Sequence, residues 1–129
     1  MSPAVRVIDA SVVLAFLLGE MTAEKAEPWL SSAIISSVNL CEIVSKLVDR
    51  GLATEAISGT IADLNLEVRP FNHTQAEQAG LLRSSTRQLG LSLGDRACLA
   101  LALDLGVSVV TADKAWTGLD IGIPIELIR

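Results

Sequence analysis

The chain has 129 residues, a net charge of −5 and two cysteines, which suits a single domain that needs no disulfide framework. Half of its residues are apolar, yet no apolar segment reaches the roughly 18 residues of a membrane span. The apolar run at 12–18 follows Asp9 and has no basic cluster before it, which argues against a signal peptide. We therefore expect one cytoplasmic domain over residues 1–129, with Cys41 and Cys98 as small buried thiols.

Strands and helices are expected to alternate along the chain. In order, the expected elements are a strand at 5–8, helices at 11–18 and 23–30, a strand at 33–36, helices at 39–50 and 54–64, a strand at 66–69, helices at 74–89 and 93–105, a strand at 107–110, a helical turn at 114–117 and a strand at 125–128. Helix-length connections require parallel pairing with right-handed crossovers. The expected fold class is α/β: a three-layer α/β/α sandwich with a central, mainly parallel sheet.

Particular residues mark the helix ends. Gly51, Gly90 and Gly106 follow predicted helices at the position where glycine commonly ends them. Thr54 is predicted to cap the helix that follows it, and Pro28 to mark a break or a first turn.

Four acidic residues stand where this fold would bring them together. Asp9 follows the first predicted strand and Asp113 the fourth, and the carboxyl ends of parallel strands are where open sheets bind their ligands. Glu42 lies on the polar face of one predicted helix, and Asp95 begins another. Because carboxylates that converge repel one another, a divalent-metal site is the leading hypothesis.

Each of these carboxylates also has a purely structural explanation. Asp9 and Asp113 suit helix caps, and Ser92 with Asp95 matches a capping box. The helix that Asp95 begins is apolar on every face over 97–103, so its amino terminus is expected to point inward, where an unpaired charge is costly.

Glu42 has two possible roles on sequence alone. A predicted apolar face opposite it comprises Leu40, Val44, Leu47 and Val48. The pattern fits either a solvated partner of Lys46 or a ligand at the edge of a cleft, with Lys46 and Arg50 further along the same stripe.

In order and spacing, these residues resemble the PIN-domain ribonucleases, particularly the VapC-type toxins of prokaryotic toxin–antitoxin pairs. The resemblance runs from Asp9-Ala-Ser11 through Glu42 to the segments 93–102 and 109–116, and so covers essentially the whole chain. It implies a PIN-like fold and an endoribonuclease that depends on Mg²⁺ or Mn²⁺.

The resemblance also assigns roles to individual residues. It implies that the metal ligands and catalytic residues are Asp9, Glu42, Asp95 and Asp113, and that Ser11 and Thr111 support the site. Cys98 and Leu99 depart from the Ile and Ala that are frequent in the family, which should affect packing alone.

RNA binding is expected from two basic pairs, although the net charge is negative. Lys46 with Arg50 and Arg83 with Arg87 have the i, i+4 spacing that places side chains on one helix face. Trp116 is expected in the core, with a role as a lone base-stacking partner as the alternative. The single histidine, His73, is expected at the surface and not in catalysis.

The resemblance further implies a cognate antitoxin and the apolar composition favours a homodimer. The expected antitoxin contacts are Val13, Leu14, Leu17 and Trp29. The surfaces around Phe16 and the ridge of Leu81 and Leu82 are expected to meet a second copy or the antitoxin.

Other classes of protein fit the sequence less well. A haloacid-dehalogenase-like phosphatase would have a second Asp where Ser11 stands, and a receiver domain would have its phosphoacceptor near Arg69 and Pro70. A PIN nuclease of RNA processing that is not a toxin, and an inactive α/β interaction module, remain alternatives.

Overall fold

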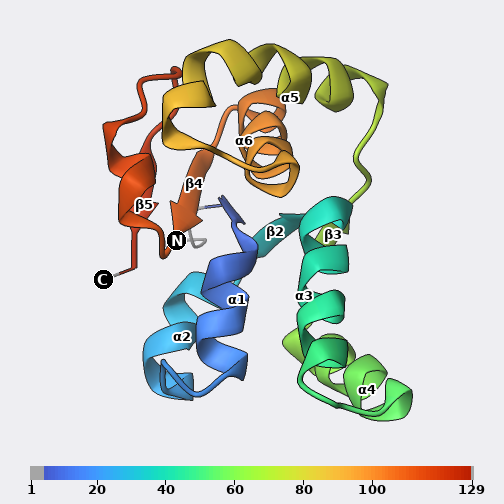
Figure 1. The fold of residues 1–129 in the computed structure, drawn as a ribbon. Helices are drawn as coiled ribbons and strands as arrows, with labels where there is room; N and C mark the ends of the chain where they lie inside the picture. Colours follow the sequence, from blue (N-terminus) through green and yellow to red (C-terminus); the bar gives the residue numbers. More distant parts are fainter. Residues whose placement is uncertain (1–4, 129) are drawn as a thin grey trace.

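The computed structural model describes residues 5–128, which form three layers around a sheet of five parallel strands (Figure 1). The strands lie in the order β3-β2-β1-β4-β5. Their bounds are Arg6–Ile8 for β1, Ala33–Ser36 for β2, Glu67–Arg69 for β3, Ser108–Thr111 for β4 and Ile125–Leu127 for β5. The predicted α/β sandwich is confirmed, and every recorded strand pair is parallel.

Adjacent residues of the central strands face opposite hydrophobic cores. Val7 of β1 is aligned with Ile34 of β2 and Val109 of β4, and all three belong to one core. The next residue on β1, Ile8, packs into the other core. Because side chains alternate across a strand, apolar residues at successive positions are required where both faces of a sheet are covered.

Helices cover both faces (Figure 1). One core is closed by α5 (His73–Thr86), α6 (Leu93–Leu105) and the 3-10 turn η2 (Lys114–Gly118). The other core is closed by α1 (Ala10–Leu17), α2 (Ala23–Leu30), α3 (Ser37–Asp49) and α4 (Thr54–Leu64). A short 3-10 segment, η1 (Arg87–Leu89), extends α5. No helix within residues 5–128 is long and apolar enough to cross a membrane.

The glycine stops are confirmed and two other boundary predictions are wrong. Gly51, Gly90 and Gly106 have φ of +87°, +65° and +66°, a backbone region that favours glycine. The residue at the N-cap of α4 is Ala53, so Thr54 is the first helical residue and does not cap the helix. Pro28 lies inside α2 without breaking it.

Several burial predictions also need correction. Cys98 is fully buried, but Cys41 is exposed on α3. Val48 is 56% exposed, although it belongs to the predicted apolar face of α3. Val13 is completely buried and therefore cannot contact an antitoxin. Leu82 is buried as well, so only Leu81 of the predicted ridge, 72% exposed, offers apolar surface.

Candidate functional site

Asp9 is held at the carboxyl end of β1 by two hydroxyl groups. Ser11 Oγ donates to Asp9 Oδ2 at 2.7 Å, and Thr111 Oγ1 donates to the same oxygen at 3.1 Å. Asp9 occupies the N-cap position of α1, yet its side chain makes no capping hydrogen bond. Within residues 5–128 no donor reaches Asp9 Oδ1. This geometry argues against the simple capping explanation and leaves one carboxylate oxygen available.

The environment of Asp9 makes its charge costly. Burial is the largest influence and raises the pKa of Asp9 from 3.8 to about 6. The hydroxyls of Ser11 and Thr111 lower this pKa, while the charges of Asp95 and Glu42 raise it. The ionisation of Asp9 is therefore influenced by two other carboxylates, although all three residues come from different parts of the chain.

Cys98 lies behind the same carboxylates. Burial raises the pKa of its thiol well above the ordinary range, and the charges of Asp9, Asp95 and Glu42 raise it further. A thiol with a raised pKa stays protonated, so Cys98 is a poor nucleophile and a poor metal ligand. Its role is packing. The influence of all three charges on this one thiol indicates that Asp9, Glu42 and Asp95 lie in the same part of the molecule.

Glu42 is fixed in place by α3 and α6 together. Asn39 Nδ2 donates to Glu42 Oε1 at 2.8 Å and to the carbonyl oxygen of Gly94 at 3.0 Å. A Cβ atom at Gly94 would lie 2.5 Å from both Cδ and Oε1 of Glu42, so the carboxylate packs directly on the first turn of α6. Glu42 is partly buried, which differs from the solvated-face explanation.

Asp95 forms the predicted capping box and also influences Asp9 electrostatically. Its Oδ2 accepts a hydrogen bond from the Ser92 N–H at 2.9 Å, and Ser92 Oγ accepts one from the Asp95 N–H at 3.1 Å. This is a complete capping box. Asp95 also raises the pKa of Asp9, so a residue that begins α6 contributes charge to the site.

Asp113 stands at the edge of this group. Its side chain is exposed and accepts a hydrogen bond from the Ala115 N–H at 3.0 Å, capping η2. Its own N–H donates to Thr111 Oγ1 at 3.0 Å. Asp113 is thus linked to Asp9 through Thr111, but its carboxylate is not among the charges that influence Asp9.

Among residues 5–128, the acidic side chains do not form a closed cage for a metal ion. Within residues 5–128, no three His, Cys, Asp or Glu side chains lie close enough together to hold an ion in this conformation. Mg²⁺ commonly retains several waters and takes only one or two protein carboxylates. The charges of Glu42 and Asp95 act on the Asp9 carboxylate, so a cation near its Oδ1 atom would relieve repulsion among the three groups.

A cleft of about 670 Å³ opens beside Glu42, between α3 and the start of α6. Its lining includes Glu42, Lys46, Cys41 and Leu93, so one of the predicted RNA contacts, Lys46, borders it. Arg50 is the C-cap residue of α3 and does not line the cleft.

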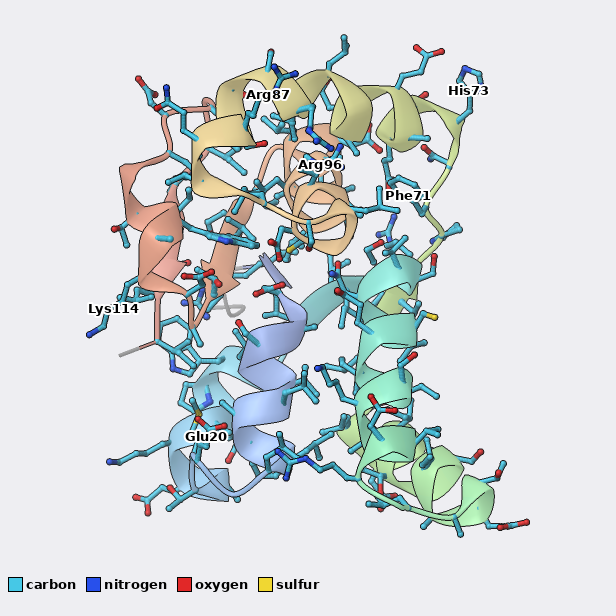
Figure 2. All side chains as sticks on the ribbon, in the orientation of Figure 1. Glu20, Phe71, His73, Arg87, Arg96 and Lys114 are labelled. Carbon is cyan, nitrogen blue, oxygen red and sulfur yellow. The ribbon has the colours of Figure 1, made fainter. Side chains whose placement is uncertain are left out.

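The second predicted basic pair lies on another layer. Arg83 and Arg87 are exposed on α5 and η1, and Figure 2 shows Arg87 on the upper layer, separated from α3 by α6. His73, at the start of α5, is also on the outside and pairs with Glu77 at 2.6 Å (Figure 2). Trp116 is fully buried as expected.

Asn39 and Gly94 are site residues that the sequence analysis did not identify. Asn39 stands one turn before Glu42 in the same helix, a spacing that permits contact. Gly94 adjoins Asp95 inside a helix, where glycine is unfavourable unless packing requires it. These two signals were available, but neither indicates which distant residue is contacted.

Comparisons with known proteins support the fold and family. The PIN domain model matches residues 6–121. A chain of DNA-bound VapBC from Salmonella typhimurium aligns at a TM-score of 0.77 and 21% identity, covering 98% of this chain and 99% of that chain. A chain of DNA-bound VapBC2 from Rickettsia felis aligns at 0.76 and 16%, covering 95% and 98%.

A third structure, VapBC-5 from Mycobacterium tuberculosis, aligns at a TM-score of 0.64 and 22% identity, covering 97% of this chain and 99% of that chain. No curated protein sequence matches the chain significantly. At these identities the structures establish a shared fold, whereas the family model covers most of the sequence. The chain belongs to the PIN domain family.

Proposed function

We propose that this protein is an endoribonuclease that depends on Mg²⁺ or Mn²⁺, and that it is the toxin of a toxin–antitoxin pair. The observation that supports the nuclease is the buried Asp9, whose pKa is raised to about 6 by burial and by the charges of Asp95 and Glu42. A fold that needed Asp9 for stability alone would gain from a neutral residue there. A cation explains why the charge is retained.

The proposed mechanism assigns a task to each part of the site. A divalent cation, held by these carboxylates, would supply activation of water and neutralisation of charge on the scissile phosphodiester. Ser11 and Thr111 orient Asp9 by donating hydrogen bonds to Oδ2, which leaves Oδ1 available to hold a cation. Glu42 and Asp95 add negative charge that strengthens cation binding, with Asp113 completing the set from the edge. Lys46, beside the cleft, binds a neighbouring phosphate.

The toxin assignment is supported by the similar structures, which are toxin–antitoxin complexes. The proposed partner is a cognate antitoxin that covers apolar surface on the α1–α2 side, where Leu14, Leu17 and Trp29 are partly exposed. We also propose that the protein acts in the cytoplasm, consistent with its two unpaired cysteines.

Expression of the protein should arrest cell growth, and co-expression of the neighbouring reading frame should restore growth. Growth that continues under expression of active nuclease would favour an RNA-processing enzyme.

Cleavage of a labelled RNA tests the nuclease directly. We expect cleavage with Mg²⁺ or Mn²⁺, none with EDTA, and a loss of at least about a hundredfold for Asp9→Asn. Asp104→Asn is the matched control, because Asp104 is an exposed carboxylate at the opposite end of α6 from Asp95. Equal cleavage by wild type and Asp9→Asn would remove the catalytic assignment and favour the inactive interaction module.

Association is a separate part of the proposal. The exposed apolar residues include Leu81 and Val48, and a specific homodimer buries about 800 Å² on each partner. We expect a homodimer at micromolar concentration, formed with or without metal. Light scattering that gives a monomer throughout this range, with no change when the neighbouring gene product is added, would contradict both the dimer and the antitoxin.

A further inference from the structure

A single buried amide connects the Glu42 carboxylate to α6. Asn39 is completely buried in the first turn of α3. Its Nδ2 group uses both hydrogens, one on Glu42 Oε1 at 2.8 Å and one on the Gly94 carbonyl at 3.0 Å. The carboxylate is therefore tied to the turn of α6 that contains Asp95.

Gly94 completes the arrangement from the other side. With any larger residue, its Cβ would lie 2.5 Å from Cδ and Oε1 of Glu42, which is shorter than any real Cβ contact. Gly94 is buried inside α6 and does not have a positive φ. Its lack of a side chain is thus explained by the space that Glu42 occupies and not by backbone conformation.

The remaining oxygen of Asn39 argues against a purely structural role. Asn39 Oδ1 is buried and has no hydrogen-bond partner among the described residues. An unpaired buried carbonyl is unfavourable, and an apolar side chain of similar size would avoid it. What an apolar residue could not do is donate to Glu42.

We propose that Asn39 is a positioning residue for metal binding, which sets the orientation of Glu42 so that this carboxylate acts together with Asp9 and Asp95. The inference rests on the proposed function, because it assumes that these carboxylates bind a divalent cation. Groups that orient a metal ligand through a hydrogen bond typically change metal affinity by about 10- to 100-fold when they are removed.

Mn²⁺ binding to the RNA-free protein, measured by electron paramagnetic resonance, tests this without relying on cleavage. Asn39→Ala should weaken Mn²⁺ binding by about tenfold. In the Glu42→Gln background, Asn39→Ala should cause no further weakening, since it acts through Glu42. Equal weakening in both backgrounds would overturn the inference, because a structural defect would not depend on Glu42.

Gln75 provides a matched control. It is a buried amide whose Nε2 donates to a carboxylate, Asp104, at 3.2 Å, and its Oε1 has no partner among the described residues. Gln75→Ala should alter thermal stability and leave Mn²⁺ affinity unchanged. If Gln75→Ala weakens Mn²⁺ binding as much as Asn39→Ala does, the effect comes from general destabilisation and the inference fails.

Gly94→Ala gives an independent test if Asn39→Ala does not fold. Alanine is the better helix former, so a loss of Mn²⁺ affinity in this variant would come from displacement of Glu42. Wild-type Mn²⁺ affinity in Gly94→Ala would overturn the inference.

Asp9→Asn distinguishes failure of this inference from failure of the proposed function. If Asp9→Asn abolishes Mn²⁺ binding while Asn39→Ala does not weaken it, the positioning role is wrong and the proposed function stands. If neither variant affects binding, the proposed function is wrong.

Discussion

The ends of β1 and β4 offer a direct comparison, because the two strands are paired and an aspartate follows each of them. After β1, Asp9 is buried, accepts from two hydroxyls and does not cap α1. After β4, Asp113 is exposed and caps η2 through the Ala115 N–H. The same residue type at the same place in a strand–helix unit is thus strained electrostatically in one case and satisfied in the other.

The difference arises from the residues around each aspartate. Ser11 and Thr111 hold Asp9 away from the capping position, whereas Asp113 is two residues before the N–H that it accepts from. A carboxylate that satisfies a helix end is stabilising without a cation, and one that is buried among like charges is not. A bound cation should therefore stabilise the charge of Asp9 more than that of Asp113.

The largest expected effect is that of Asp9→Asn. The pKa of Asp9 rises from 3.8 to about 6 on folding, so its ionisation costs about 3 kcal/mol at pH 7. The contribution of Asp9 to the stability of the metal-free protein should be most favourable below about pH 4 and become less favourable as the pH rises to about 6. Asp9→Asn should remove this decline and raise the melting temperature at pH 7 by on the order of 10 °C.

Thermal unfolding from pH 3.5 to 8, with and without Mg²⁺, measures this effect. Mg²⁺ should restore much of the lost stability in the wild type and little in Asp9→Asn. If the difference in stability between the wild type and Asp9→Asn is the same at pH 4 and pH 7, Asp9 is not strained and the contrast with Asp113 disappears.

Thr111→Val should have the next largest effect, because Thr111 connects the two aspartates. The substitution removes a donor to Asp9 and leaves the Asp113 N–H without its acceptor, which costs about 1–3 kcal/mol. Because this hydroxyl lowers the pKa of Asp9, the pH at which stability is lost should move upward. If the pH at which stability is lost is the same in Thr111→Val and the wild type, the Thr111 hydroxyl does not influence the ionisation of Asp9, and the link between the two aspartates is not supported.

Asp113→Asn should change stability little, within about 0.5 kcal/mol, since asparagine caps a helix about as well as aspartate. We nevertheless expect weaker metal binding and slower cleavage, by less than for Asp9→Asn. Calorimetric Mn²⁺ titration and chemical denaturation check the two expectations. A gain in metal-free stability equal to that of Asp9→Asn would mean that both aspartates are equally strained.

The smallest effect concerns RNA binding on α3. Lys46 borders the cleft and Arg50 does not, so Lys46→Ala should reduce the slope of log affinity against log salt by about one phosphate contact. Arg50→Ala should reduce it less, and the double variant should leave metal affinity nearly intact. If neither substitution alters the slope, the RNA path lies elsewhere, and Arg83 with Arg87 should be examined.

The sheet and most helix boundaries were predictable because their signals are local. Apolar runs on the central strands and glycines such as Gly51 and Gly106 act within a few residues. The burial of α6 over 97–102 followed equally from apolar residues on every face. The errors at Thr54 and Cys41 concern single side chains whose environment is set by neighbouring helices.

The details of the site required distant contacts that no local pattern encodes. Asn39 and Gly94 are 55 positions apart, and their hydrogen bond depends on how α3 packs on α6. Asp113 caps η2 through a local N–H, whereas Asp9 accepts a hydrogen bond from Thr111 of β4, 102 positions away, and does not cap α1. Sequence therefore identified the candidate acidic residues but not the groups that orient them.

The two cysteines give this protein a natural reporter position. Cys98 is fully buried and its thiol pKa is raised. Cys41 is exposed and lines the cleft beside Glu42. A maleimide fluorophore or nitroxide added to the unmodified chain should therefore attach at Cys41 alone. Labelling would place a spectroscopic probe next to the proposed metal and RNA sites without any engineered residue, so that cation and substrate binding become observable in the native sequence.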